Sequence, residues 1–286
     1  MLMTLMTGAL LALAPMQQDT TVPVQPGTRL QLNAHQGEII VRTWNRNAVQ
    51  ASADLSSRDR LEVSVEGQVV RVRSVSRRGA PRVTDYRLTV PVWMDLELGT
   101  VGGDIRVDGT EGRVTATSVE GNVTVHGGRE FVSIHSVEGE VEATGIRGRL
   151  EINSVDGDIL VEDVVGAIYA ETVDGAITLD RVQSDNVEAS TVDGDIVYRG
   201  PIARSGRYKL GSHDGNITLE VPEPLNATVS TSTFSGDFTT CGYTVTLSGN
   251  GSYSKRRFRF SLGDGSARID LESFDGTIAI NKPGCR

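Results

Sequence analysis

A carboxylate recurs about every 18 residues through the middle of this 286-residue chain, each time directly before a glycine. It belongs to a repeated phrase, Ser/Thr-Val-Asp/Glu-Gly, of which Ser154-Val155-Asp156-Gly157 is one copy. Carboxylates stacked at strand spacing repel one another unless they are solvated, paired or bridged by cations. The column could be a weak site for Ca²⁺ or a cationic partner, but we favour a set of well-hydrated Asp-Gly and Glu-Gly corners. It contains Glu120, Glu138, Asp156, Asp174, Asp193 and Asp214, with Asp158 and Asp195 close by in sequence.

Hydroxyl side chains form a second column, two positions before the carboxylates. We expect them to hydrogen-bond within the stack, with binding of sugar hydroxyls as the alternative. The histidines have no metal-ligand spacing, and no nucleophile–base signature such as G-x-S-x-G is present. The sequence therefore predicts no catalytic residue, no cofactor and no metal site. The hydroxyl column is Ser118, Ser136, Ser154, Thr172 and Thr191, and the histidines are His35, His126, His135 and His213.

The glycines of the phrase predict the corners of a coil. A weaker series at Gly112, Gly148 and Gly166 halves the period, so the unit has about nine residues, too few for a helix and a strand together. Glycine adopts positive φ at a tight corner without a Cβ penalty, and a preceding Asp or Glu suits a turn. The predicted corner glycines are Gly103, Gly121, Gly139, Gly157, Gly175, Gly194, Gly215, Gly236 and Gly276.

Between the corners the residues alternate between apolar and polar, as in a half-buried strand. Asn122–His126 is one such segment, with Val123 and Val125 directed inward. The fold class is therefore all-β: a parallel β-solenoid, right-handed by the general preference for parallel crossovers, with two strands and about 18 residues per coil. The full inward set is Val123/Val125, Val132/Ile134, Val141/Ala143, Leu150/Ile152, Ile159/Val161, Ile168/Ala170, Ile177/Leu179, Val187/Ala189 and Ile196/Tyr198.

The two ends of the chain differ from the middle, and we expect four segments. Residues 1–16 resemble a secretory signal, which we favour over a disordered apolar tail. Residues 17–98 form an irregular β cap, 99–240 the regular solenoid, and 241–286 a C-terminal β cap, because an exposed parallel edge would promote aggregation. Strands are expected at Arg29–Ala34, Glu38–Thr43, Leu61–Glu66, Gln68–Ser74 and Asp85–Val90, and protruding loops within Arg199–Ser212 and Glu220–Thr233.

The only two cysteines, Cys241 and Cys285, lie outside the regular repeats. An exported chain would pair them, and the bond would hold the C-terminal cap onto the last coils. Two buried free thiols are the alternative. Neither cysteine belongs to a CxxC motif, so a metal or redox role is not expected.

Charge is distributed unevenly along the chain. Residues 100–199 contain 7 basic and 20 acidic residues, a net charge of −13, whereas each flanking part has a net charge of +2, which together give −9. This argues against nucleic acid as a partner of the coils, because binding to phosphates requires Lys and Arg. Basic clusters at Arg77-Arg78 and Lys255-Arg256-Arg257 could contact an anionic envelope polymer, although solvated edges are the favoured interpretation.

Three stretches carry a family resemblance: Gly-Glu-Ile-Ile-Val-Arg-Thr-Trp at Gly37–Trp44, Leu-Thr-Val-Pro at Leu88–Pro91, and the iterated Ser/Thr-Val-Asp/Glu-Gly-Asp-Ile. Together they resemble the DUF4097 family of bacterial envelope proteins, which are named adhesins. The resemblance covers nearly the whole mature chain. It implies a β-solenoid fold and an extracytoplasmic location (periplasm, cell envelope or secreted), and it supplies no catalytic motif.

Three functional hypotheses follow. The first is a non-enzymatic envelope or secreted solenoid that presents repetitive faces to an envelope protein or a surface glycan, with membrane contact only through an uncleaved N-terminal segment. The second is a polysaccharide-active β-helix enzyme, for which Arg204, Arg207, Lys209 and Glu220 are the candidate residues. The third is a scaffold that assembles end to end, as bactofilins do.

Overall fold

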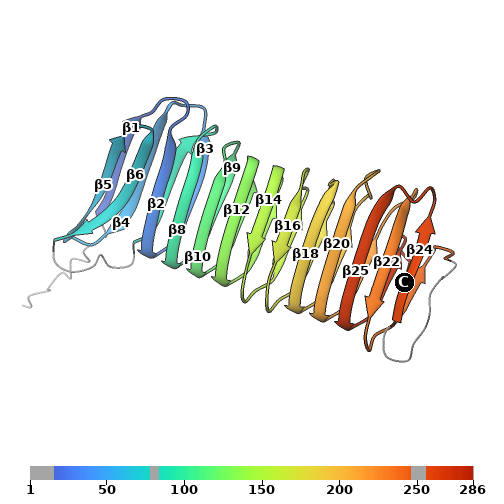
Figure 1. Cartoon of the computed structure of the whole chain (residues 1–286). Coiled ribbons are helices and arrows are strands. Elements are labelled where there is room, and N and C mark those ends of the chain that lie inside the picture. Colours follow the sequence, from blue (N-terminus) through green and yellow to red (C-terminus); the bar gives the residue numbers. More distant parts are fainter. Residues whose placement is uncertain (1–15, 78–83, 246–255, 286) are drawn as a thin grey trace, which may run out of the picture.

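The computed structural model describes residues 16–77, 84–245 and 256–285, and within these ranges the regular structure is β throughout. The strands form two 13-stranded sheets that face each other along an elongated body (Figure 1). The expected all-β solenoid, with two parallel-dominated sheets and no helix, is confirmed. In the same ranges, no helix is long and apolar enough to cross a bilayer.

Successive coils of the central region contribute one strand to each sheet. Neighbouring strands pair in parallel and are offset by one copy of the repeat, as in Val123↔Val141 and Val141↔Ile159. Sheet A runs through β9 (Ile105–Thr110), β11 (Val123–Gly127), β13 (Val141–Thr144), β15 (Ile159–Glu162), β17 (Ile177–Asp180), β19 (Ile196–Arg199) and β21 (Ile217–Glu220). Sheet B runs through β8 (Asp95–Gly102), β10 (Val114–Glu120), β12 (Arg129–Glu138), β14 (Arg147–Asn153), β16 (Ile168–Glu171), β18 (Asn186–Asp193) and β20 (Arg207–Asp214).

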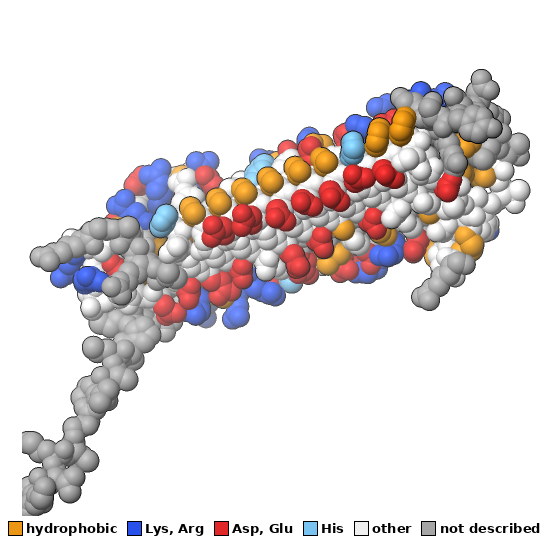
Figure 2. Space-filling model, turned by 90° about the horizontal axis from the view of Figure 1, so that it is seen from below, with side chains coloured by type: hydrophobic (Ala, Val, Ile, Leu, Met, Phe, Trp, Pro, Cys, Tyr) orange, Lys and Arg blue, Asp and Glu red, His pale blue; other side chains and the backbone are white. Residues whose placement is uncertain are grey.

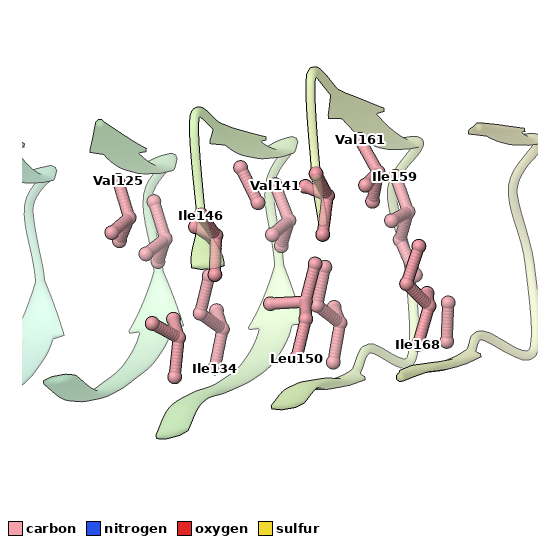
Figure 3. Close-up of a cluster of buried hydrophobic side chains, with 14 of the residues drawn as sticks. Val125, Ile134, Val141, Ile146, Leu150, Ile159, Val161 and Ile168 are labelled. Atoms are coloured by element: carbon pink, nitrogen blue, oxygen red, sulfur yellow. The ribbon is translucent and has the colours of Figure 1, made fainter. Parts of the chain in front are cut away.

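The core is a thin aliphatic layer between the two sheets (Figure 3). Every residue of the predicted inward set is at most 1% exposed. Ile146, Val164 and Val182 close the layer at the corners that lead from sheet A to sheet B. Burying a Val, Leu or Ile side chain stabilises a fold by about 1.5–3 kcal/mol, so the ladder of coils is held together mainly by this layer.

The corner glycines are packed directly on one another from coil to coil. Gly157 has φ +133°, and a Cβ built there would lie 2.3 Å from the carbonyl oxygen of Gly139. Gly236 and Gly276 lie in the same column without a left-handed φ, yet a Cβ would lie 1.8 Å and 2.0 Å from the neighbouring glycine oxygen. Close backbone approach is therefore the feature that the whole column shares.

At the N-terminal end, further strands extend both sheets beyond the first coil, which comprises β2 (Arg29–Gln36) and β3 (Ile39–Trp44). The outermost pairs, β1–β4 and β5–β6, are antiparallel. Strands lie at the five positions expected here, whereas β1 and β4 lie where none was expected. Sheet A is extended by β7 (Tyr86–Pro91), β4 (Ala48–Leu55) and β1 (Met16–Pro23), and sheet B by β6 (Val69–Ser76) and β5 (Asp59–Glu66).

At the C-terminal end the chain passes outward and then returns. The last strands, β25 (Ala267–Asp275) and β26 (Ile278–Asn281), insert between the coil of β20 and β21 and the coil of β22 (Ala227–Thr233) and β23 (Phe238–Cys241). The antiparallel strand β24 (Arg256–Leu262) then ends sheet B. Within residues 241–286, where a C-terminal cap was expected, β25 and β26 therefore continue the regular ladder, and of the strands described there only β24 is an antiparallel end strand.

A disulfide joins Cys241, the last residue of β23, to Cys285 beyond β26, with the two Cα atoms 5.9 Å apart. It ties the outer coil to the strand pair that inserts beneath it. The division of the chain into four segments stays a prediction. The predicted secretory signal falls almost entirely outside the described residues, because the first described residue is Met16.

Candidate binding surface

The carboxylate column lies fully on the surface, along one corner of the solenoid. Strand pairing and isolated bridges place its members side by side in consecutive coils, as in Glu138↔Asp156 and Asp156↔Asp174. Asp275 continues the column next to Asp214. Figure 2 shows these side chains as a continuous row along the body. Within the described part of the chain, the only ion-pair contact of this row joins Asp214 to His213, at 4.0 Å.

The neighbouring carboxylates have a structural role. Oδ1 of Asp158 accepts a hydrogen bond from the backbone N–H of Ala176 at 2.8 Å, and Oδ1 of Asp195 accepts one from the N–H of Asn216 at 2.7 Å. Each therefore satisfies a donor of the next coil. The suggestion that they assist a Ca²⁺ ladder is not supported by this geometry. Among the described residues, no group of three or more His, Cys, Asp or Glu side chains is arranged to hold a metal ion.

The hydroxyl column points into the solenoid. Ser118, Ser136, Ser154, Thr172 and Thr191 are between 1% and 6% exposed, so the alternative that they bind sugar hydroxyls is wrong. Thr191 donates to the carbonyl oxygen of Gly175 at 3.0 Å, and Ser212 donates to that of Gly194 at 2.9 Å. The hydroxyls that form such bonds bind the corner backbone of the preceding coil rather than one another. Those of Ser118, Ser136 and Ser154 are buried without a hydrogen-bond partner among the described residues, so the expected hydrogen bonding within the stack is wrong for these three.

The residue between each buried hydroxyl and exposed carboxylate faces solvent, and five of these residues are valines. Val101 continues their row in the preceding coil, where Gly102 takes the place of the carboxylate. We call these six valines the valine ridge, and they are 38–50% exposed. The same row continues through an aromatic end, which consists of His213, Phe274 and Phe234. The ring of Phe274 stacks on that of His213, with 4.7 Å between the ring centroids, and on that of Phe234, with 4.8 Å between the centroids. Figure 2 shows the ridge running directly beside the carboxylate column. The valine ridge is Val101, Val119, Val137, Val155, Val173 and Val192.

A shallow groove of about 430 Å³ lies beside the aromatic end. The side chain of Arg257 from β24 and that of Glu272 from β25 line it, together with serine hydroxyls. Gly211 also lines it. The groove therefore places hydrogen-bonding groups of both charges next to exposed ring edges.

The sequence contained the signal for the valine ridge, although the expectations did not use it. Once the hydroxyl of Ser154 is directed inward, the two-residue period of a strand directs Val155 outward. The outward valine is thus a consequence of the same phrase that defines the corner. The aromatic end could not be predicted from the sequence, because its three residues come from three looser copies of the phrase. Phe234 and Phe274 become neighbours only because strand β25 inserts beside β22.

The histidines are dispersed, as expected. His126, at the end of β11 in sheet A, lies 3.1 Å from Asp108, whereas His135 lies on β12 in sheet B. His135 is exposed, whereas His126 is half-buried. In the basic clusters, Arg78 and Lys255 fall outside the described residues.

The four residues considered for an enzyme do not converge. Arg207 and Lys209 lie on β20 in sheet B, whereas Glu220 ends β21 in sheet A. Three of the four pair with other residues: Lys209 with Glu188 at 2.7 Å, Glu220 with Arg199 at 3.3 Å, and Arg204 with Asp264 at 2.8 Å.

Three solved structures resemble the chain at low similarity. A putative cell adhesion protein from Clostridium sporogenes is 9% identical, with a TM-score of 0.24 over 94% of this chain and 99% of that one. A putative adhesin from Bacteroides fragilis is 9% identical, with a TM-score of 0.36 over 93% and 97%. One from Parabacteroides distasonis is 11% identical, with a TM-score of 0.34 over 94% and 97%. At this similarity no property of these proteins is carried over.

A comparison with curated proteins finds no significant match. The family model described as Toastrack DUF4097 matches residues 21–202 and again residues 171–281. The two matches together cover both ends of the solenoid and all of its regular coils. The chain therefore belongs to the DUF4097 (Toastrack) family.

Proposed function

We propose that this protein is a non-enzymatic binding protein of the extracytoplasmic space that presents long rows of side chains to an envelope protein or a surface glycan. The observation that carries the proposal is the continuous exposed row formed by the valine ridge and the aromatic end, in register with the carboxylate column. A contiguous exposed apolar row of this kind is typical of interaction surfaces. The parallel ladder underneath fixes the spacing of both rows.

The proposed location rests on two features. The disulfide between Cys241 and Cys285 requires an oxidising compartment to form and persist. The apolar start of the chain is the kind of segment that directs export. Removal of residues 1–16 would leave a chain that begins within β1, which pairs with β4 through Pro23.

The two alternatives are less well supported. The enzyme candidates are spread over both sheets, and three of them already form ion pairs with other residues. End-to-end stacking of coils requires parallel edges, whereas antiparallel pairs end both sheets at the N-terminal end and sheet B at the C-terminal end. A glycan remains a specific second partner class, because the groove beside Phe274 offers hydroxyl, carboxylate and guanidinium groups.

The test is capture in the native envelope. The full chain with a C-terminal tag is expressed in its own host, crosslinked with formaldehyde, and recovered under denaturing conditions beside an untagged control. We expect a discrete envelope protein or a cell-surface polymer, and alkylation of the recovered chain should find both cysteines oxidised. Reduced cysteines together with recovery of cytosolic material only would contradict the proposal.

A further inference from the structure

We propose that the valine ridge and the carboxylate column together dock a basic amphipathic α-helix of a partner protein. The proposal rests on the binding function above and specifies its surface and the chemistry of the partner. Its starting point is the position of the valines. They lie on the outer side of the corner, away from the aliphatic layer between the sheets, so burial in the core does not account for them.

The spacing of the ridge selects a helix over a strand. Consecutive valines are one coil apart, about 4.8 Å, so the six span about 24 Å. One turn of an α-helix rises 5.4 Å, so an apolar helical stripe drifts only about 3 Å from the ridge over this distance. Same-face side chains of an extended strand are about 6.7 Å apart and lose register within two or three coils. A helix of about 16 residues can therefore contact every valine.

The charge of the carboxylate column indicates that the partner helix is basic. The carboxylate column lies beside the ridge. From Glu120 to Asp193, its carboxylates have no ion-pair partner among the described side chains. A helix with Lys or Arg on the flank of its apolar stripe would pair with this column while it covers the valines. A second copy of this chain would instead bring together two sections whose net charge is −13 over residues 100–199. An anionic lipid surface would be repelled in the same way.

The probe is an 18-residue peptide of Leu and Lys in which Leu recurs at every third or fourth position. Two control peptides isolate its properties: one has the same composition with the Leu stripe scrambled, and the other has Glu in place of every Lys. Binding to the purified chain from residue 17 onward is measured by fluorescence anisotropy at several salt concentrations. We expect the amphipathic Leu/Lys peptide to bind at least tenfold more tightly than either control, with an affinity that falls as salt rises.

Three variants locate the site. The triple variant V137T/V155T/V173T removes apolar surface while keeping the shape of the side chains, and should weaken binding at least tenfold. E138Q/D156N/D174N should weaken binding and reduce its dependence on salt. Val165→Thr is the matched control, because Val165 is 40% exposed at the opposite corner between β15 and β16. It should leave the affinity unchanged, and all variants should keep the wild-type thermal midpoint within about 2 °C, since exposed substitutions change stability little.

Equal binding of the amphipathic and scrambled peptides would overturn the proposal, and so would equal affinities of the ridge triple variant and Val165→Thr. A concentration-dependent wild-type dimer that the ridge triple variant abolishes would overturn it in favour of a second copy. Failure here is distinguishable from failure of the proposed function. If wild type and the ridge triple variant capture the same partner in the envelope, the docking surface is wrong while the binding function stands.

Discussion

Alanine at Gly157 should destabilise the solenoid strongly, because this position combines a left-handed φ with direct contact between coils. At Gly157 φ is +133°, and a Cβ would lie 2.3 Å from the carbonyl oxygen of Gly139 and 2.7 Å from its carbonyl carbon. Both contacts are with backbone, which cannot move aside without shifting the neighbouring corner. The perturbation therefore tests whether coil-to-coil contact, and not backbone conformation alone, requires glycine in the column.

The magnitude follows from two contributions. Holding alanine in this region of φ costs about 1–3 kcal/mol. Forcing a methyl group into a filled contact costs about 1–3 kcal/mol more. A central value of about 4 kcal/mol corresponds to a fall in thermal midpoint of roughly 8–16 °C for a chain of this size.

Two glycines provide matched controls. Gly67 has φ +59°, and a Cβ at this position would have no atom within 4 Å, so Gly67→Ala isolates the conformational cost, about 1–2 kcal/mol. Gly211 lacks a positive φ, and the nearest atom to its Cβ position is 3.9 Å away, so Gly211→Ala should be neutral within about 0.5 kcal/mol. Thermal unfolding followed by far-ultraviolet circular dichroism gives the midpoints. Equal midpoints for Gly157→Ala and Gly67→Ala would refute the contact argument.

Four other predictions follow from the same geometry. Replacing Cys241 and Cys285 by alanine opens a link across a sequence separation of 44 and should cost up to about 4 kcal/mol in chemical denaturation; an unchanged midpoint would show that the disulfide does not stabilise the C-terminal end. Asp158→Ala removes the acceptor for the N–H of Ala176 and should cost about 1–3 kcal/mol, whereas Asp156→Asn, next to it on the surface, should be neutral or slightly stabilising; equal losses would contradict the separate roles. Calcium and chelator should give the same melting midpoint, and a rise of several degrees with calcium would restore the metal interpretation of the column. Burial raises the pKa of Tyr198 and Tyr208 above that of an unfolded tyrosine. The free energy of unfolding should therefore be unaffected by these groups below about pH 10 and should fall as the pH rises further. An ultraviolet titration in which both tyrosines ionise freely at about pH 10 in the folded chain would contradict this.

The sequence predicted the repeat and its core well, because both depend on local rules. A nine-residue unit is too short for a helix and a strand together, and alternation then assigns inward residues such as Ile159 and Val161 directly. The positions of the corner glycines and their positive φ could also be predicted, but their packing against one another could not. Their contact with the glycine of the preceding coil depends on how closely two coils stack, which a single copy of the repeat does not reveal.

The ends were harder to predict because they depend on non-local pairing. Nothing local in Ala267–Asp275 indicates that this strand inserts beside β20 instead of following β24 outward. The surface was also only partly predictable. The carboxylates were identified as a column, but Asp156 and Asp158 could be separated into an exposed and a structural role only when the hydrogen bond to Ala176 was seen.

Site-specific photocrosslinking in the native envelope shows whether the valine ridge contacts a partner protein. A photoreactive phenylalanine analogue is placed at Val155 on the ridge or at Val165 on the opposite corner, two positions that are 47% and 40% exposed. We expect a discrete adduct with a protein partner from position 155, in which the contacting peptide is basic and amphipathic, and none from position 165. The same adduct from both positions, or an adduct from position 165 alone, would contradict this expectation.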